Sequence, residues 1–334
     1  MPDKIEDGIG DESGMKKMTM TRYRFLTIAL GVLLLSVAGW GARFAWWLEL
    51  TTHFKVQYLI LGGLLLPAVL WSRCRWLVAI VLFGVGLNAV AVLPWYLPTS
   101  ITSPHSEPVT IAFANVLRSN PNPEQLLQWV EDTQPAVVVL EEITPQLEAA
   151  LRDWDRIFPY QLKAIRQDAF GIALYSQIPF TGKEIHTFGP RDIPWLETTL
   201  LFDNTPLKVW ALHPYPPVSV RAAQQRNALL DQVAQQIQTH SQPPDLFQIV
   251  VGDLNTSVWS PFYQDFVRRS RLKNTRQGFG IEPTWPTYNV FLSTPLDHIL
   301  VSPNLNVHQA QAGPFIGSDH LPFMAIVSIP EAQS

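Results

Sequence analysis

The sequence contains few cysteines and few charged residues. Its single cysteine, Cys74, excludes an intrachain disulfide and any metal site built from several thiolates. Only 16% of the 334 residues are Asp, Glu, Lys or Arg, whereas soluble domains average about 25%. Because 47% of the residues are hydrophobic, the composition excludes a disordered chain. The position of the excess apolar residues in the sequence is therefore informative.

The sequence also lacks an excess of positive charge in its longer, C-terminal part, residues 101–334. Residues 1–100 contain nine Lys or Arg and six Asp or Glu, whereas residues 101–334 contain 15 and 22. An acidic C-terminal region is not typical of a tight, non-specific DNA-binding protein. A local cluster of five cations within residues 268–276 is either a solvated surface or a guide for polyanionic substrates or anionic lipids.

Three long uncharged runs follow a polar, flexible tail at residues 1–24. They lie within residues 25–42, 56–72 and 76–104, and tryptophans gather at their ends. A membrane-spanning helix needs about 20 mostly apolar residues, often with interfacial aromatics. We therefore expect three transmembrane helices within residues 25–103. The alternatives are a cleaved signal peptide, disfavoured by the two runs that follow, and three buried core helices.

Positive charges near these runs predict the orientation of the chain. Four Lys or Arg residues precede the first run, and Arg73 and Arg75 lie between the second and the third. We expect the protein in the plasma or inner membrane. The positive-inside rule then predicts that its N-terminus lies in the cytoplasm. After three crossings, the C-terminal domain is expected on the extracytoplasmic side.

From residue 104 to 334, short β-branched runs alternate with amphipathic stretches, which predicts a single α/β domain. We expect strands at 108–116, 136–143, 171–179, 198–203, 207–217, 246–255, 296–302 and 322–329. We expect helices at 123–133, 144–154, 218–240 and 260–270.

Polar side chains gather where these strands begin or end. They are Asn115, Glu141, Glu142, His213, Asp253, Asn255, Asp297, His298, Asp319 and His320. One such residue alone is usually a solvated or hydrogen-bonded loop residue, but their gathering at successive strand ends indicates a functional site. Carboxylate and amide oxygens without thiolates suit Mg²⁺ or Mn²⁺, and the absence of HExxH disfavours zinc.

A hard cation beside Asp and His side chains is typical of phosphoryl chemistry, in which carboxylates activate water and imidazoles stabilise charge. The sequence has no GxxxxGK[ST] motif and no GxSxG motif. A nucleotide triphosphatase of that type and an α/β-hydrolase with that motif are therefore disfavoured.

These motifs resemble the endonuclease/exonuclease/phosphatase superfamily, the DNase I-like metal-dependent phosphohydrolases. The resemblance covers about residues 108–329 and runs through AFANV, VVVLEE, GIALYSQIP, ALHPYPP, VVGDLNTSVWSPF, GFGIEPTWPTY, PLDHILVS and GSDHLPF. The TWP block and the N-terminal apolar runs are similar to the bacterial membrane-attached branch. The resemblance implies an α/β (α+β) four-layer sandwich, two β-sheets flanked by helices, for a catalytic domain at 104–334.

The resemblance also implies a metal site. Glu142 is expected to bind the metal, with Asn115 orienting its surroundings and Asp319 as a further contact. The family often has Gln before this glutamate, where this chain has Glu141, which either tightens metal binding or faces solvent. His298 is expected to be structural.

The same resemblance implies catalytic roles. Asp253 is expected to orient and deprotonate the attacking water, and Asn255 to hold the phosphate or a metal-bound water. His320, oriented by Asp297, is expected to stabilise or protonate phosphoryl oxygens, and His213 to donate a hydrogen bond to a phosphate oxygen.

The sequence thus predicts a membrane-anchored phosphoesterase that uses Mg²⁺ or Mn²⁺ and cleaves phosphodiester, nuclease-like, or phosphomonoester bonds. Nucleic acid, lipid and nucleotide substrates remain open, and the bilayer is an expected partner, whereas no obligate protein partner is expected. The alternative is an inactive membrane protein that uses the fold for binding.

Overall fold

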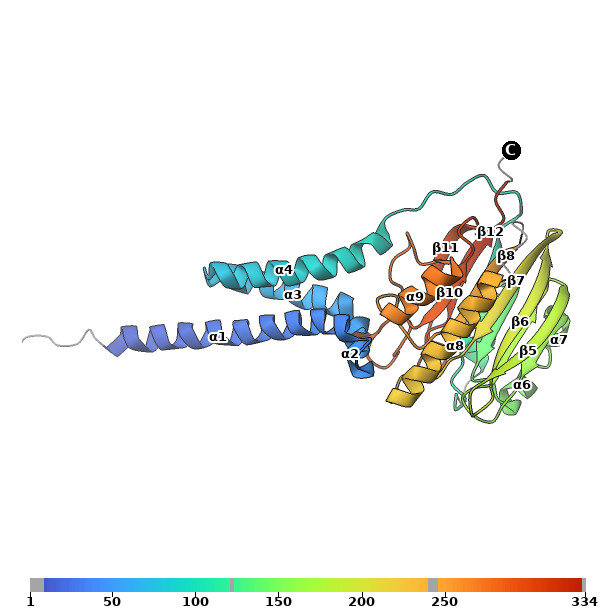
Figure 1. Ribbon diagram of the computed structural model, residues 1–334, viewed down its shortest axis with the longest axis horizontal. Coiled ribbons are helices and arrows are strands. Elements are labelled where there is room, and N and C mark those ends of the chain that lie inside the picture. Colours follow the sequence, from blue (N-terminus) through green and yellow to red (C-terminus); the bar gives the residue numbers. More distant parts are fainter. Residues whose placement is uncertain (1–8, 121–122, 240–245, 332–334) are drawn as a thin grey trace, which may run out of the picture. The chain divides into compact units, whose positions relative to one another are not determined.

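The computed structural model describes residues 9–120, 123–239 and 246–331, and side chains from residue 23 onward (Figure 1). The chain divides into two compact units, residues 1–92 and 93–334. Each unit is described separately below.

The first unit is helical. Its elements are α1 (Ile9–Ala38), α2 (Trp46–Leu50), α3 (Lys55–Trp71) and α4 (Arg75–Val92), with single turns η1 (Gly39–Gly41) and η2 (Thr51–Phe54). Helices α1, α3 and α4 pack on one another around Ala29, Val69 and Leu77. Three segments are long and apolar enough to cross a membrane, namely Tyr23–Gly41, Trp46–Trp71 and Arg75–Tyr96.

The second unit contains two six-stranded sheets. The first has the order β11-β12-β1-β2-β4-β3 and the second the order β5-β6-β7-β8-β10-β9. The strands of the first are β1 (Val109–Asn115), β2 (Val137–Glu141), β3 (Tyr160–Ala164), β4 (Ile172–Ser176), β11 (Asn306–Ala312) and β12 (Phe323–Ser328). Those of the second are β5 (Phe180–Phe188), β6 (Ile193–Phe202), β7 (Thr205–Leu212), β8 (Phe247–Asp253), β9 (Lys273–Asn274) and β10 (Asp297–Val301).

Both sheets have a parallel pair at their centre, β1–β2 in the first and β7–β8 in the second. Each pair is joined by a helix, as a parallel connection requires. Helix α5 (Glu124–Thr133) joins β1 to β2, and α8 (Val220–Thr239) joins β7 to β8. The carboxyl ends of the parallel strands in each sheet therefore lie side by side, where polar side chains can meet.

Alternation along the strands separates an inner core from two outer faces. Phe113, Val139 and Val251 belong to the core between the two sheets. Alternate residues of the first sheet, such as Leu140, pack instead with Trp129 of α5. The same outer cluster includes residues around α6 (Pro145–Ala150) and α7 (Trp154–Ile157). On the second sheet, the side chain of Gln248 in β8 donates to the Ile237 carbonyl of α8. Helices thus cover both outer faces, and the expected four-layer sandwich is confirmed.

Four strands, β3, β5, β9 and β11, are missing from the sequence prediction, and they are the edge strands of the two sheets. An edge strand pairs on one side only and is less buried, so its sequence lacks a long apolar run. The expected helix at 144–154 is also wrong in detail, because it is two short helices, α6 and α7. The other helix of the domain, α9 (Pro261–Ser270), follows the prediction.

Candidate active site

Four polar residues extend the inner rows of the two sheets at the same end of the sandwich. Asn115 and Glu141 face each other across β1 and β2, and Asp253 faces Asp297 across β8 and β10. Asn115 comes two residues after the core residue Phe113, so both side chains lie on one face of β1. The same alternation directs the other three toward the space between the sheets. All four side chains are buried.

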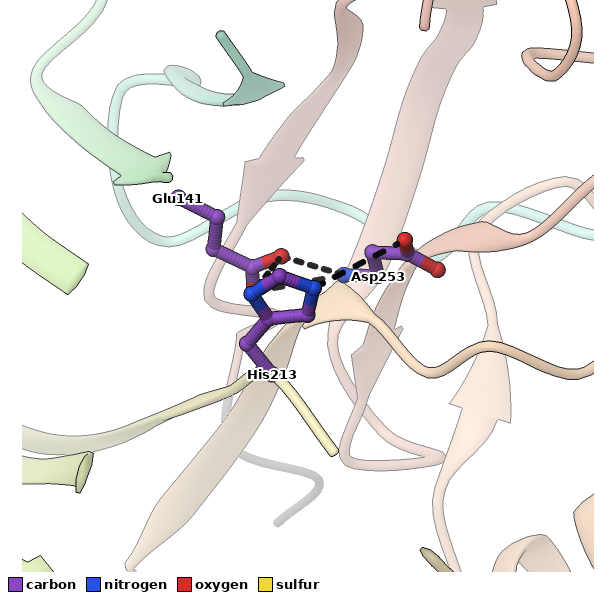
Figure 2. A group of neighbouring side chains, drawn as sticks. All are labelled: Glu141, His213 and Asp253. Carbon is purple, nitrogen blue, oxygen red and sulfur yellow. Dashed lines mark hydrogen bonds and ion pairs between the residues drawn. The ribbon is translucent and has the colours of Figure 1, made fainter. Parts of the chain in front are cut away.

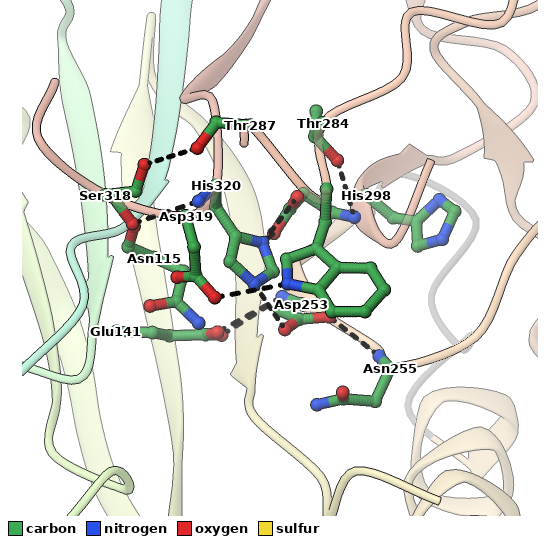
Figure 3. Close-up of polar contacts among 12 residues, drawn as sticks. Asn115, Glu141, Asp253, Asn255, Thr284, Thr287, His298, Ser318, Asp319 and His320 are labelled. Atoms are coloured by element: carbon green, nitrogen blue, oxygen red, sulfur yellow. Dashed lines mark hydrogen bonds and ion pairs between the residues drawn. The ribbon is translucent and has the colours of Figure 1, made fainter. Parts of the chain in front are cut away.

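His320 joins the two acids of the second sheet (Figure 3). Its Nδ1 lies 3.0 Å from both carboxylate oxygens of Asp297, and its Nε2 lies 3.7 Å from Oδ2 of Asp253. Burial opposes the charge on this ring, but the carboxylates of Asp297 and Asp253 outweigh burial and raise the pKa of His320 to about 10. The ring is therefore an imidazolium at neutral pH.

Ser318 ties the loop of His320, which joins β11 to β12, to β1 of the same sheet. Its hydroxyl accepts a hydrogen bond from the backbone N–H of His320 at 3.1 Å and donates to the carbonyl of Asn115 at 2.7 Å. The histidine of this loop is thereby held across the end of the sandwich between β1 and β10.

Asp253 lies at the centre of the cluster. Burial raises its pKa to about 7, although the positive charge of His320 opposes that rise. One carboxylate oxygen accepts the backbone N–H of Asn255 at 2.8 Å, and the Asn255 side chain donates to the Pro214 carbonyl at 3.1 Å. Asn255 has φ +50°, a left-handed conformation that Asn adopts more readily than most residues. The Asp253 carboxyl is thus oriented by the turn that follows β8.

Glu141 is buried beside His213 and Asp253 (Figure 2). Its two oxygens lie 3.3 and 3.2 Å from the backbone N of Asp253, which donates to them. Burial and the charges of Asp253 and Asp297 raise the pKa of Glu141 well above its ordinary value. Of the two alternatives for Glu141, the solvent-facing side chain is therefore wrong.

His213 lies between these acids without a close partner at Nδ1. That atom is 3.7 Å from Oε2 of Glu141, too far for a hydrogen bond, and it has no hydrogen-bond partner among the described residues. Its Nε2 lies 4.0 Å from Oδ2 of Asp253. Burial lowers the pKa of His213 to about 3, although a backbone hydrogen bond with Ala169 opposes that fall, so the ring is neutral.

Glu142 leaves the strand with φ +60° and is only partly buried. Its Oε1 accepts the side-chain amide of Asn115 at 3.3 Å, and its Oε2 accepts the backbone N–H of Arg118 at 3.1 Å. The carboxylate borders a cavity of about 210 Å³. Asn115 thus holds the Glu142 carboxylate through its amide N–H, and its own amide oxygen accepts the backbone N–H of Leu117 at 3.1 Å.

Two groups in this cluster have donor atoms within 4.8 Å of one another, Glu141 with His213 and Asp253, and Asp253 with Asp297 and His320. The first group could hold a metal ion, whereas the protonated ring of His320 has no lone pair to offer one. Asp319 belongs to neither group. Its Oδ2 accepts the indole N–H of Trp285 at 3.2 Å (Figure 3).

His298 points away from this cluster. It follows Asp297 in β10, so its side chain lies on the opposite face of the strand. Its Nδ1 lies 3.2 Å from the amide nitrogen of Asn274, and its Nε2 lies 2.9 Å from the Thr256 carbonyl. Burial lowers the pKa of His298 to about 3. These contacts agree with a structural role.

Comparison with known proteins places the chain in a family. The model of the Endonuclease/Exonuclease/phosphatase family matches residues 112–320, which include every polar residue of the cluster. The chain belongs to this family. A sequence search among curated proteins finds no significant match.

Solved structures of other proteins have the same fold. Humanized TDP2 from D. rerio is 17% identical, with a TM-score of 0.56, and the match covers 66% of this chain and 99% of that chain. The human Nocturnin catalytic domain is 18% identical with a TM-score of 0.53, covering 67% and 96%. A mannosyl-6-phosphatase from Bacteroides thetaiotaomicron is 16% identical with a TM-score of 0.53, covering 66% and 100%. At these identities the likeness establishes the fold.

Arg276 contacts the polar cluster, and the sequence does not predict this. It is one of the five cations within residues 268–276, but its side chain is buried and its Nη1 donates to the Asp297 carbonyl at 2.6 Å. Its guanidinium lies 3.7 Å from the centre of the Phe323 ring. Arg269, by contrast, is an exposed partner of Asp231. The five cations therefore do not form one surface, and no sequence signal separates Arg276 from the others.

Proposed function

We propose that the protein is a membrane-anchored, divalent-metal-dependent phosphodiesterase whose catalytic domain lies on the extracytoplasmic side. Its main support is the buried group of Asp253, Asp297 and His320, in which one carboxylate is free to accept a proton and one imidazolium is fixed by the other. Neighbouring structures support phosphate esters as the substrate class, since one TDP2 structure contains a single-stranded DNA product and another neighbour is a mannosyl-6-phosphatase.

Asp253 acts as the general base in this proposal. A pKa of about 7 suits a group that must accept a proton from water near neutral pH. The backbone N–H of Asn255 orients one oxygen and leaves the other facing His213 and His320. Water between Asp253 and a phosphate is therefore deprotonated as it attacks phosphorus.

His320 stabilises the negative charge that develops on the phosphoryl oxygens. Asp297 holds its Nδ1, so Nε2 points toward the reacting group with a proton to donate. His213 supplies a neutral ring on the other side of Asp253, and Asn255 places an amide beside the phosphate.

Asn115 and Glu142, with Asp319, would hold Mg²⁺ or Mn²⁺. The Glu142 carboxylate is only partly buried and borders a cavity, so it is open to such a cation, and the Asn115 amide holds it there by a hydrogen bond. When bound, the cation supplies positive charge that neutralises the phosphate. A binding protein without activity is disfavoured, because burying this many ionisable groups is costly unless they serve a function.

Metal removal tests this proposal with the full-length protein in detergent. Hydrolysis of bis(4-nitrophenyl) phosphate is expected with Mg²⁺ or Mn²⁺, to vanish with EDTA, and to return when the cation is restored. Hydrolysis that persists in EDTA would contradict metal dependence.

A reporter enzyme fused to the C-terminus, of a kind that is active only outside the cytoplasm, tests the orientation. A fusion that is intact but inactive would contradict the extracytoplasmic orientation.

A further inference from the structure

An apolar loop tip lies next to the catalytic cluster. Tyr288, Val290, Phe291 and Leu292 expose 75%, 74%, 82% and 47% of their surface. We call residues 288–292 the apolar tip. Large apolar side chains in such a contiguous exposed group mark a surface that contacts a partner or a membrane.

The apolar tip is held in place by the loop that carries it. At the base of the loop, the backbone N–H of Trp285 donates to the Thr294 carbonyl at 3.1 Å, and Thr294 donates back at 2.6 Å. Within the tip, the Asn289 side chain accepts the backbone N–H of Phe291 at 3.1 Å and begins the single turn η4 (Val290–Leu292). The tip is therefore a defined projection.

The same loop is joined to the loop of His320. The backbone N–H of Thr287 donates to the Asp319 carbonyl, and its hydroxyl donates to the Ser318 carbonyl, both at 2.9 Å. The indole of Trp285 donates to the Asp319 carboxylate. Tyr288 thus begins the apolar tip one residue beyond a direct contact with the segment that positions His320.

The end of the third candidate span is hydrogen-bonded to residues 277–280, which precede the loop of the apolar tip. The carbonyl of Trp95 accepts the backbone N–H groups of Gly278 and Gly280, both at 3.0 Å, and the Pro94 carbonyl accepts the side chain of Gln277 at 2.8 Å. Trp95 lies within the span Arg75–Tyr96. The segment that carries the apolar tip is therefore hydrogen-bonded, at its beginning, to the last residues of the third candidate span.

The composition of residues 277–296 favours lipid over nucleic acid as the partner of the apolar tip. Residues 277–296 contain no Lys or Arg and a single acidic residue, Glu282. Nucleic-acid-binding surfaces combine stacking aromatics with cations that contact the phosphates. Val290 and Leu292 beside two aromatics suit the boundary between lipid headgroups and acyl chains.

We propose that the apolar tip inserts into the bilayer that anchors the protein and presents a phospholipid phosphodiester of that bilayer to Asp253 and His320. This inference rests on the proposed phosphodiesterase function and names its substrate class. Hydrolysis breaks the bond between phosphorus and the diacylglycerol oxygen, water supplies the new oxygen on phosphorus, and the diacylglycerol oxygen takes up a proton, so the phosphorylated headgroup is released. Tip insertion brings such a headgroup within reach without removing the lipid from the membrane.

Insertion is measured directly with a fluorescent label. Because Cys74 is the only cysteine, Cys74→Ser combined with Phe291→Cys accepts one environment-sensitive label at the tip. The full-length protein is placed in nanodiscs of phosphatidylethanolamine and phosphatidylglycerol with nitroxide-bearing lipids. Quenching is expected for this label and not for one at Ile185→Cys, a half-exposed apolar position on the edge strand β5. An unquenched label at position 291 would overturn the proposal and leave the tip as a protein-binding surface.

Lipid hydrolysis is measured separately. Phosphate-containing headgroups released from the same nanodiscs are compared with hydrolysis of bis(4-nitrophenyl) phosphate, a soluble diester. Phe291→Ser with Leu292→Ser is expected to lower the ratio of lipid to soluble-diester rates at least about tenfold, whereas Ile185→Ser leaves the ratio unchanged. An unchanged ratio in the tip variant would overturn the proposal. A wild-type protein that cleaves neither substrate would contradict the phosphodiesterase function itself, and the quenching result would still decide insertion.

Discussion

Two Asp–His dipeptides of this chain have opposite surroundings. His298 of Asp297–His298 lies on the outer face of β10, where Asn274 and Thr256 contact its ring and burial lowers its pKa to about 3. His320 of Asp319–His320 faces two carboxylates, and its pKa rises to about 10 despite burial. The same Asp–His dipeptide therefore contains a neutral histidine in one region and a protonated histidine in the other.

The partners are also exchanged between the two dipeptides. Asp297, from the first, holds His320 of the second, whereas Asp319 accepts the indole N–H of Trp285. Alternation along β10 explains the exchange, because it sends Asp297 inward and His298 outward. The comparison teaches that strand face and cross-sheet pairing, and not adjacency in sequence, decide which acid serves which histidine.

The largest difference between the two regions is expected when each histidine is replaced. His320→Gln should lower kcat for a phosphodiester by about 100- to 10,000-fold, because a charged donor to the phosphoryl oxygens is lost. His298→Gln should change kcat less than about threefold while costing about 1–3 kcal/mol of stability through its buried hydrogen bonds. Steady-state kinetics and chemical denaturation of both variants check this pair. Equal losses of kcat would remove the distinction.

A somewhat smaller effect is expected when the shared acid is neutralised. Asp297→Asn removes the charge that most raises the pKa of His320, so this pKa should fall from about 10 toward the ordinary histidine value. We expect kcat to fall by about 100-fold, since the imidazolium is less favoured and less well oriented. NMR titration of the His320 ring measures the shift directly. An unchanged ring pKa would show that another group supports the cation.

The smallest expected effect concerns stability and pH. The pKa of His298 is about 3 in the folded protein and about 6.5 in the unfolded chain. The unfolded state binds the extra proton below pH 6.5, so the contribution of the neutral ring is present above that pH and is lost as pH falls toward 3. The loss approaches about 1.4 kcal/mol per pH unit.

Denaturation of the wild type and His298→Gln between pH 7 and pH 5 isolates this contribution, because the other histidines are common to both proteins. The difference in unfolding free energy between the two should shrink as the pH falls. A constant difference would mean that His298 keeps an ordinary pKa.

Much of the fold follows from apolar alternation, and what was missed has a physical reason. The central strands β1, β2, β7 and β8 are buried on both faces and appear as apolar runs. The edge strands do not, because β5, with the sequence FTGKEIHTF, exposes most of its residues. Pairing with β6 makes it a strand, and such a partner is invisible to a local pattern.

The cluster shows a similar limit. Asn115, Asp253, Asp297 and His320 stand at predicted strand ends, and the structure brings them together. The surroundings of Glu141 and Arg276 could not be predicted, because both depend on contacts with residues far away in sequence, the backbone of Asp253 and the carbonyl of Asp297. Burial of a charge is decided by such tertiary contacts and not by neighbouring letters.

The most direct measurement is hydrolysis of bis(4-nitrophenyl) phosphate by full-length Asp253→Asn with saturating Mg²⁺ or Mn²⁺, beside Asp231→Asn as a matched exposed control. The proposed general base predicts a loss of about 1,000-fold in kcat for Asp253→Asn and a rate like wild type for Asp231→Asn. Hydrolysis by Asp253→Asn at the wild-type rate would contradict the role of this cluster as the active site.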